Sequence, residues 1–447
     1  MASEQQYIEL FAQTESTICK HSAEVINLPR RDAMEHFKHS GFPSTKTEEY
    51  RYTDIDALFA PDYGMNLNRL HIPAHPQDAF KCEVPNMSTL LYFIVNDQFY
   101  ESSFPHTSLP EGVIIDSLRS AARSHPELVA RYYAQLGLSE NDSITALNTA
   151  YVQDGLFIYL PKGVKLEKTL QIVNLNRANV DFMSHRRMLI VLEENTELRM
   201  LVCDHSMDDV RFLTTQVNEV YVGENASFDL YELEETHNQT TRLSNLYVRQ
   251  ETHSRVLLNG MTLHNGTTRN QTRILLNGEG AETNMVGMAI SDQKQHVDNL
   301  THIDHAVPNC TSYELYKYVL DGEATGAFNG KVLVRPHAQH TNSLQSNKNL
   351  CMTRTAHMYT QPQLEIYADD VKCGHGSTVG QLDENALFYM QSRGINAKEA
   401  RLMLMFAFVG DVIDYIRIDA LRDRLHHLVE KRFRGEFNKC QGCQMCK

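Results

Sequence analysis

Long apolar runs are missing from this chain of 447 residues, and none approaches the roughly 18 apolar residues that a membrane-spanning helix needs. The first residues, MASEQQYIEL, contain neither a basic segment nor a continuous apolar one, so we expect no signal peptide. Positive charge is also scarce, because 42 Lys and Arg residues stand against 56 Asp and Glu residues, a net charge of −14. General binding to nucleic acid or to an anionic membrane uses clustered Lys and Arg, so we expect neither partner.

The cysteines do not follow the regular pattern of a disulfide framework. There are nine, an odd number, and they are scattered except at the C-terminus. This usage is typical of a reducing compartment. Together with the missing export signal, it predicts a cytoplasmic protein. The length allows two or three domains, or one long repetitive domain, with ample residues for a buried core.

Common catalytic motifs are absent too. Gly326 and Gly330-Lys331 come near the phosphate-binding pattern G-x-x-x-x-G-K-[ST], but the first gap is one residue short and Val332 replaces the hydroxyl residue. We interpret this stretch as a turn between strands. Neither a G-x-S-x-G elbow nor an H-E-x-x-H helix is present. The sequence therefore predicts no nucleotide site, and any ATP hydrolysis is expected in a partner.

The middle of the chain, from about residue 144 to residue 379, consists of short apolar runs separated by turn signals. Glu194, Glu224 and Glu279 each mark an acidic turn after an aliphatic pair, at intervals of 30 and 55 residues. No long helical pattern interrupts this region, so it predicts either a β-sandwich or a β-solenoid. The runs include Leu156–Leu160, Leu189–Leu192, Val217–Val222, Val256–Leu258 and Ile274–Leu276, and Asn-Gly or Asp-Gly turn signals stand at residues 259–260, 265–266, 277–278, 321–322 and 329–330.

Helical patterns lie on both sides of this region. Residues 3–28, Arg31–His39 and Ser117–Gln135 are expected to be helical, and Leu90–Val95 to be a buried strand. We therefore expect four regions, which are a mainly helical one (1–140), the β core (141–380), a C-terminal helical domain (381–435) and a cysteine-rich tail (436–447).

The C-terminal helical domain carries local start and stop signals. Asp383 can cap a helix that stops at Gly394, and Asn396 with Glu399 forms a capping box for a helix over Ala397–Tyr415. A third helix is expected at about Asp419–Arg434. These helices are strongly apolar, so they either pack only on one another or provide a docking surface for a partner.

The segment KCGHGSTVG contains the strongest candidate site of the chain. Cys373 and His375 stand two residues apart among glycines, so an extended backbone would project both side chains to one face. A thiolate with an imidazole suits zinc or iron–sulfur chemistry rather than magnesium or calcium. Two ligands do not complete a metal site, so the others must come from elsewhere or from another chain. The alternative is a Gly-rich turn with a buried free cysteine and a hydrogen-bonded histidine.

Two other groups of candidate ligands are weaker. The tail KCQGCQMCK places Cys440, Cys443 and Cys446 at a spacing that can wrap three thiolates around one metal or one cluster face. Its alternative is a tail with incidental thiols, since chain ends are usually mobile. The segment HVDNLTHIDH also gathers potential ligands, which we interpret as structural because short polar strands often expose such residues. They are His296, His302, Asp304 and His305.

Three segments resemble the SufB/SufD family of the Suf iron–sulfur cluster assembly scaffold. The segment from Pro362 to Ile395 closely resembles the SufD branch of that family. FPSTKTEEYRYTDI, residues 42–55, is similar to the N-terminal family signature, with Tyr50 where the aromatic residue is usually Trp. AFNGKVLV, residues 327–334, resembles the family core and precedes an expected strand over His337–Thr341. The chain departs from the family in lacking Trp and in its cysteine-rich tail.

The resemblance implies a mainly β fold, with a right-handed parallel β-helix core flanked by N-terminal and C-terminal α-helical segments. It implies a heterodimer with SufB through the β-helix, attachment of the ATPase SufC at the C-terminal helices, and a possible homodimer in isolation. Cys373 and His375 would then lie at the SufB interface and hold iron or a transient iron–sulfur cluster, with His375 the better candidate ligand. The protein would be a scaffold subunit without its own catalytic or nucleotide site.

Three alternatives remain open at this point. The first is the sister subunit SufB, for which a Glu- and His-bearing loop would be expected in place of KCGHGSTVG. The second is a β-helix enzyme that processes polysaccharides, which predicts secretion, paired carboxylates in a cleft and often calcium. The third is a structural interaction module without cluster chemistry.

Overall fold

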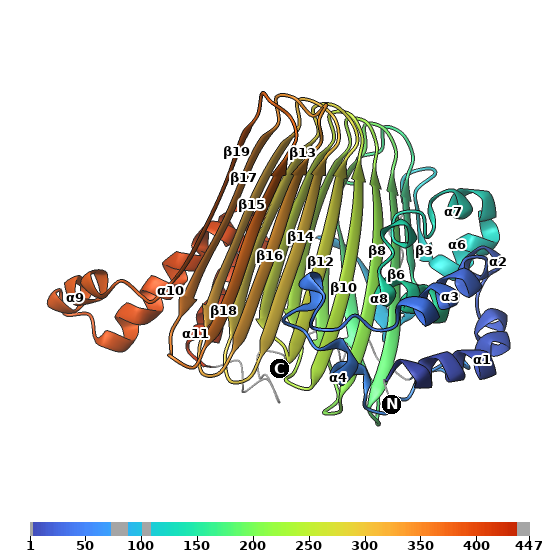
Figure 1. Cartoon of the computed structure of the whole chain (residues 1–447), viewed down its shortest axis with the longest axis horizontal. Coiled ribbons are helices and arrows are strands. Elements are labelled where there is room, and N and C mark those ends of the chain that lie inside the picture. The colour runs from blue at the N-terminus through green and yellow to red at the C-terminus, as the bar shows by residue number, and fades with distance from the viewer. Residues whose placement is uncertain (1–2, 73–87, 101–108, 436–447) are drawn as a thin grey trace.

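The computed structural model is a parallel β-solenoid with helices against both of its outer faces (Figure 1). The structure describes residues 3–72, 88–100 and 109–435. Successive strands alternate between two sheets, so that each coil contributes one strand to each sheet, and eight coils follow one another. The expected fold class, a parallel β-helix flanked by helical segments, is confirmed.

The two sheets are named A and B. Sheet A contains β3 (Ile114–Ser117), β4 (Leu156–Leu160), β6 (Phe182–Leu192), β8 (Phe212–Val222), β10 (Thr240–Gln250), β12 (Thr267–Leu276), β14 (His296–His305), β16 (Thr325–Val334) and β18 (His357–Ile366). Sheet B contains β1 (Thr89–Val95), β2 (Gln98–Tyr100), β5 (Thr169–Asn176), β7 (Glu197–Ser206), β9 (Ser227–Glu235), β11 (Arg255–His264), β13 (Glu282–Ser291), β15 (Thr311–Leu320), β17 (Asn342–Cys351) and β19 (Lys372–Gly380). β1 pairs in parallel with β5, whereas β2 and β3 pair antiparallel with β1 and β4.

The repeat length follows from the turns that lead into sheet B. Six residues in left-handed backbone conformation stand two positions before its strands, at intervals of 27 to 31 residues. They are Asn195, Asn225, His253, Gly280, Asn309 and His340. Gly and Asn favour this conformation, which explains much of the series. The three acidic markers directly precede members of the series, so their intervals of 30 and 55 residues correspond to one coil and two coils.

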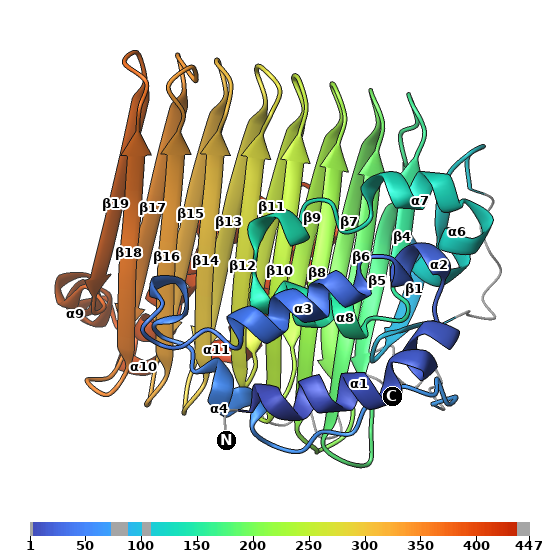
Figure 2. The same cartoon turned by 45° about the vertical axis from the view of Figure 1, so that its right-hand side comes forward.

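Nine α- or 3₁₀-helical segments precede the regular coils in the described residues. Figure 2 shows several of them lying across the outer face of sheet A, where α8 contacts β6 and β8. They are α1 (Glu4–Lys20), α2 (Glu24–Asn27), α3 (Arg30–Ser40), the 3₁₀ helix η1 (Glu48–Tyr50), α4 (Ile55–Phe59), α6 (Leu118–Ser124), α7 (Pro126–Tyr132), the 3₁₀ helix η2 (Leu138–Glu140) and α8 (Ser143–Tyr151).

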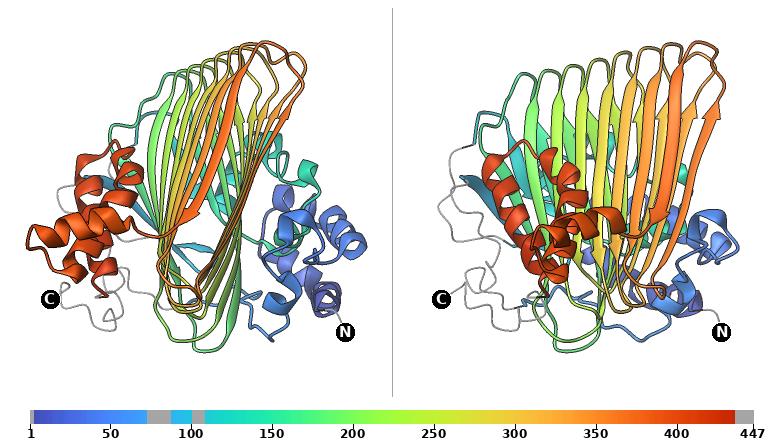
Figure 3. Two further views of the ribbon diagram at one scale, coloured as in Figure 1. Left: turned by 60° about the vertical axis from the view of Figure 1, so that its left-hand side comes forward. Right: turned by 90° about the vertical axis from the view of Figure 1, so that its left-hand side faces the viewer.

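The three C-terminal helices return along the opposite outer face. They are α9 (Glu384–Ser392), α10 (Ala397–Asp414) and α11 (Asp419–Phe433). Figure 3 shows them beside sheet B, with the N-terminal helices on the other side of the solenoid. Their expected caps are present: Asp383 accepts hydrogen bonds from the amides of Asn385 and Ala386, and Asn396 accepts one from the amide of Glu399. In the described residues, no helix is long and apolar enough to cross a membrane.

Three details differ from the sequence expectations. Helix α8 occupies residues expected to begin the β region, because Asp142 caps it and burial of every one of its residues removes the polar face that marks a surface helix. Asn259-Gly260 and Asn329-Gly330 lie inside β11 and β16 rather than in turns. Gly330 faces a crowded part of the solenoid interior, where a Cβ atom would collide with Gln345, whereas Gly260 borders a cavity. Residues 337–341 form a turn before β17, with His340 at φ 60°, rather than a strand.

Candidate functional site

Cys373 and His375 lie on β19, the last strand of sheet B. β19 pairs in parallel with β17, and it aligns Cys373 with Ser343 and His375 with Gln345. Ser343 and Gln345 are 3% and 1% exposed and face the interior of the solenoid. Parallel strands in register keep aligned side chains on the same face. Cys373 and His375 therefore both face the interior, as their spacing predicted for an extended backbone.

The interior is uncovered at this position. In the described chain no further coil follows β18 and β19, and we call the face that these two strands leave uncovered the open end. Cys373 is half-buried and His375 is exposed, although the residues aligned with them one coil earlier are buried. Edge strands present unpaired backbone groups that can pair with another chain. The open end thus presents a thiol and an imidazole on a surface suited to a partner.

The Cys373 thiol lies against an apolar wall. Its neighbours in the last coils include Val332, Val334, Ala338 and Leu364. Burial raises the pKa of the Cys373 thiol, and a backbone hydrogen bond from Ser343 opposes that shift. The protonated thiol is therefore favoured until a cation or a base approaches it.

The pair is an incomplete metal site within this chain. Among the described residues, no three His, Cys, Asp or Glu side chains gather as a metal site would require. The alternative of a Gly-rich turn does not describe the geometry, because Lys372–Gly380 is a regular strand. Whether Cys373 and His375 bind a metal remains a prediction. Cys440, Cys443 and Cys446 lie outside the described residues.

The N-terminal signature lies beside the same end of the molecule, which the sequence did not reveal. The Glu48 carboxylate accepts hydrogen bonds from the amides of Gln361 and Gln363 on β18, at 2.7 and 2.8 Å. The ring of Tyr52 stacks on that of Tyr359, with centroids 4.4 Å apart. We call residues 48–53 the strap, because this segment runs along the outer face of sheet A to its last strand (Figure 2).

Tyr50 anchors the middle of the strap. Its hydroxyl donates a hydrogen bond to Asp142, and the guanidinium of Arg269 lies 3.8 Å from its ring centroid. Thr53 donates a hydrogen bond to Asp298 on β14 at 2.7 Å. Two sequence motifs that are more than 300 residues apart therefore meet at the last coil.

The histidines of β14 have structural partners. The Nε2 atom of His296 lies 3.1 Å from the Thr53 hydroxyl, and that of His305 lies 2.9 Å from the Ser312 hydroxyl. Arg273 donates to Nδ1 of His302. Burial lowers the pKa of His302 and of His305 to about 4, so both rings are neutral at pH 7. The fourth residue, Asp304, pairs with Arg335, which directly follows the neighbouring strand β16.

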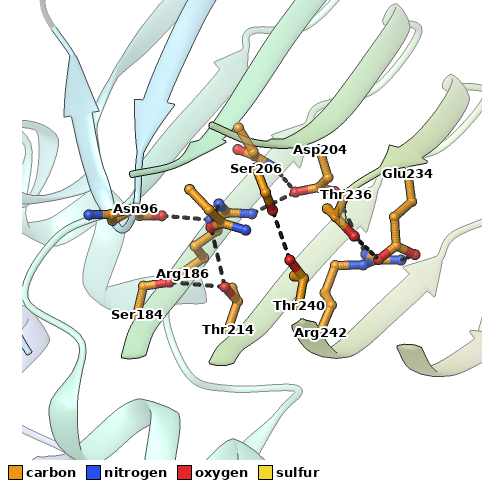
Figure 4. Close-up of polar contacts among 12 residues, drawn as sticks. Asn96, Ser184, Arg186, Asp204, Ser206, Thr214, Glu234, Thr236, Thr240 and Arg242 are labelled. Atoms are coloured by element: carbon orange, nitrogen blue, oxygen red, sulfur yellow. Dashed lines mark hydrogen bonds and ion pairs between the residues drawn. The ribbon is translucent and has the colours of Figure 1, made fainter. Parts of the chain in front are cut away.

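Polar side chains also fill part of the solenoid interior, which the sequence reasoning missed. Figure 4 shows two arginines of sheet A, Arg186 and Arg242, directed at carboxylates of sheet B. Arg186 pairs with Asp204 at 2.5 Å, and Arg242 pairs with Glu234 at 3.4 Å. Arg186 and Arg187 interrupt an apolar run in β6, and this conflict was the available signal.

A cavity of about 40 Å³ lies beside these pairs. Its lining includes Glu232, Arg242 and Gly260. That volume exceeds the roughly 10–15 Å³ that one water molecule requires, and the polar lining suits water.

The C-terminal helices are attached to sheet B by charged contacts. Lys317 pairs with Asp411, Arg432 with Asp292 at 2.9 Å, and Arg417 with Asp229 at 3.0 Å. Beyond these anchors, α9 projects away from the solenoid (Figure 1). Its aromatic side chains Phe388 and Tyr389 are 73% and 59% exposed, so this arm leaves a large apolar surface without a covering element.

Comparison with known proteins gives matches over most of the chain. Residues 173–408 match the SufBD core domain of the SUF system for FeS cluster assembly, and residues 1–172 match the SufBD protein N-terminal region. An iron–sulfur cluster assembly SufBD family protein of Synechocystis sp. is 27% identical over 399 residues, 87% of either chain. The iron–sulfur cluster assembly protein SufD of Escherichia coli is 26% identical over 407 residues, 89% of this chain and 90% of that one. The protein of the same name from Bacillus subtilis is 27% identical over 327 residues, 72% of this chain and 74% of its own.

Proposed function

Since the chain belongs to the SufBD family of the SUF iron–sulfur cluster assembly system, we propose that its open end is the SufD half of a cluster assembly site shared with SufB. The membership accounts for the β-helix and does not favour the polysaccharide-processing alternative. The similarity to proteins named SufD favours the SufD role over that of the sister subunit.

One observation carries the proposal. Cys373 and His375 face the interior from β19, a strand that no following coil of the described chain covers. A second β-helix docked on the open end would cover both groups and continue the sheets. Its own side chains would complete the coordination of iron or of a nascent cluster, which is the cargo of the assembly.

The chemistry of the two groups fits that cargo. A neutral imidazole and a thiolate are ligands for iron and for iron–sulfur clusters. The apolar surroundings favour the protonated thiol in the free subunit, so binding of a cation would release the thiol proton. His375 is exposed, so its ring nitrogens are accessible, which makes it the first ligand in the proposal.

The remaining roles fall to partners and to the tail. The chain has no phosphate-binding loop, so ATP hydrolysis would belong to a SufC-like ATPase docked on the exposed aromatic surface of α9 and the adjoining part of α10. The protein would act as a cytoplasmic scaffold rather than as an enzyme, with a homodimer possible in isolation. The three tail cysteines would bind a metal, a cluster or a persulfide transiently.

Substitution of the pair tests the site. We expect Cys373→Ala/His375→Ala to lower cluster yield per purified SufB-containing complex, under anaerobic supply of iron and sulfur, without changing complex stoichiometry. The matched control is Cys351→Ala/His357→Ala, which removes a half-buried cysteine and an exposed histidine from neighbouring strands. Normal yield from the first variant refutes the site. A fall in yield that only follows loss of the complex assigns the pair a structural role.

Truncation tests the docking surface. Removal of residues 381–447 should abolish co-purification of the ATPase. A finer test is Phe388→Ser/Tyr389→Ser, which changes two exposed side chains of α9. This double variant should weaken the same interaction while leaving the thermal unfolding midpoint unchanged. Retention of the ATPase by both variants would place its docking surface elsewhere.

A further inference from the structure

We infer that Gln345 is a positioning residue for His375, and that its side-chain amide oxygen accepts a hydrogen bond from the imidazole when the open end takes up its cargo. The inference rests on the proposed function of His375. It concerns a residue one coil below the open end, where the side chain closes the interior beneath the histidine.

A hydrogen bond to Glu314 determines the orientation of the Gln345 amide. Its Nε2 atom donates a hydrogen bond to Oε2 of Glu314 at 2.6 Å, and Glu314 is 1% exposed. When Glu314 is ionised its carboxylate can only accept, so in that state it determines which end of the amide faces it. Oε1 of Gln345 must then point away from Glu314.

The Gln345 amide fits against sheet A because one residue of that sheet, Gly330, has no side chain. Gly330 on β16 has no side chain, and a Cβ atom there would collide with Nε2 of Gln345. The Asn-Gly pair within β16 thus has a packing role. Gln345 reaches across the interior from sheet B to sheet A, and the absence of a side chain at Gly330 permits that reach.

The outward-facing oxygen lacks a partner. Gln345 is 1% exposed, yet its Oε1 atom accepts no hydrogen bond among the described residues. A buried acceptor left unpaired has lost its hydrogen bonds to water without replacing them, which destabilises a structure. A donor that reaches Oε1 therefore gains an interaction that the free subunit does not make.

His375 is the donor that register brings to it. β17 and β19 align the two residues as direct neighbours, and side chains aligned in this way are about 4.8 Å apart. Cys373 and Ser377, the next interior-facing residues of β19, align with Ser343 and Asn347 instead. An imidazole N–H that donates to Gln345 leaves the other ring nitrogen as a lone-pair ligand directed out of the open end.

The proposed arrangement is a series of hydrogen bonds that joins three side chains. Glu314 accepts from Gln345, Gln345 accepts from His375, and the free ring nitrogen binds the cargo. A hydrogen-bonded partner behind a ligating histidine selects its tautomer and its ring orientation, and loss of such a partner reduces metal affinity by about 10- to 100-fold.

The experiment compares two leucine variants in the complex with SufB. Gln345→Leu removes the acceptor at nearly constant volume. Asn347→Leu, the matched control, changes a buried amide on the same strand that aligns with Ser377. We expect Gln345→Leu to lower cluster yield per complex by at least tenfold and Asn347→Leu to leave it within twofold. An equal loss in both variants would show damage to the end coils only and overturn the inference.

A charge-conserving exchange provides the rescue. In Glu314→Gln/Gln345→Glu the two groups trade places, so the new carboxylate accepts from the new amide and still offers an oxygen to His375. We expect this double variant to recover most of the yield that Gln345→Leu loses. Failure of the rescue in a folded complex would contradict the hydrogen bond to His375.

The imidazole gives a readout that does not require a loaded cluster. In the full chain labelled with ¹⁵N-histidine, we expect the His375 ring to occupy one tautomer in the presence of iron and to average between two in Gln345→Leu. The signal is assigned by its loss in His375→Ala. If His375→Ala leaves cluster yield normal, the proposed function fails. If His375→Ala lowers the yield but Gln345→Leu changes neither yield nor tautomer, only the present inference fails.

Discussion

The two halves of the solenoid interior hold buried carboxyl groups in opposite ways. In the N-terminal half, Asp204 and Glu234 face the guanidinium groups of Arg186 and Arg242. In the C-terminal half, Glu314 is held by the amide of Gln345 instead. The first half also lies under β2, β3 and the N-terminal helices, whereas the second ends at uncovered strands.

The difference indicates that the two halves of the solenoid interior have different roles. Repeat proteins require capping at their ends, because an exposed coil leaves its interior in water. Ion pairs enclosed in the N-terminal half join the strands of the two sheets by charged contacts. The C-terminal half keeps neutral polar groups near the open end, which in the proposed function accepts a cation or a cluster. A fixed arginine there would repel an approaching cation.

The largest expected effect comes from breaking an enclosed pair. Asp204→Ala leaves the guanidinium of Arg186 without its carboxylate, and we expect a loss of about 3–5 kcal/mol in unfolding free energy. Urea unfolding followed by circular dichroism measures it. The control is Asp304→Ala, which removes the partner of the half-exposed Arg335 on the outer face and should change stability by about 1 kcal/mol or less. Similar losses in both variants would remove the energetic distinction between interior and surface pairs.

The second prediction concerns Glu314 and pH. Burial raises the pKa of Glu314 from 4.5 to about 7, and hydrogen bonds from Thr301 and Gln345 oppose the shift. The folded state therefore binds this proton more tightly than the unfolded state. The resulting stabilisation is complete below pH 4.5 and is lost as the pH rises to about 7.

Each pKa unit corresponds to about 1.4 kcal/mol, so the change over this interval is about 3 kcal/mol. Glu314→Gln should make the unfolding free energy less dependent on pH between 4.5 and 7. Unfolding curves at several pH values compare the variant with the unsubstituted protein. An identical pH dependence in both would show that Glu314 titrates normally.

A smaller effect is expected from two glycines that are direct neighbours in sheet B. Gly260 and Gly287 both face the interior and align between β11 and β13. A Cβ atom on Gly287 would lie 2.5 Å from the ring of Tyr316, whereas one on Gly260 would meet no atom within 4 Å. We expect Gly287→Ala to destabilise by about 1–3 kcal/mol and Gly260→Ala to be tolerated. Thermal unfolding of the two variants measures this directly, and equal midpoints would show that the Tyr316 ring moves aside.

The sequence predicted those features that depend on neighbours in the chain. The caps at Asp383 and Asn396 and the common face of Cys373 and His375 follow from spacings of two or three residues, and they are present. The choice between a sandwich and a solenoid came from the family resemblance. It did not come from the pattern of apolar runs, because that pattern contains the same short strands in both folds.

Features that join distant residues could not be predicted in this way. The contact of Glu48 with Gln361 spans 313 residues, and the function of Gly330 depends on Gln345 in the opposite sheet. The interior ion pairs were not predicted from the sequence. In a strand that is buried on both faces, polar and apolar residues do not alternate, so the sequence does not show which side chains face inward. Such pairings are visible only when the register of the coils is known.

The smallest expected effect concerns the strap, and it tests whether the open end is held in place from outside. Glu48→Ala/Tyr52→Ala removes two hydrogen bonds and one aromatic stack from β18. These contacts are exposed, so we expect a global stability change of about 1 kcal/mol or less. Amide exchange in β18 should nevertheless accelerate, because an edge strand opens locally before the whole protein unfolds. Exchange in β10, which is paired on both sides, should not change and provides the internal reference. If exchange in β18 is unaffected, its pairing with β16 alone orders the last coil, and the meeting of the two motifs at the open end has no energetic role.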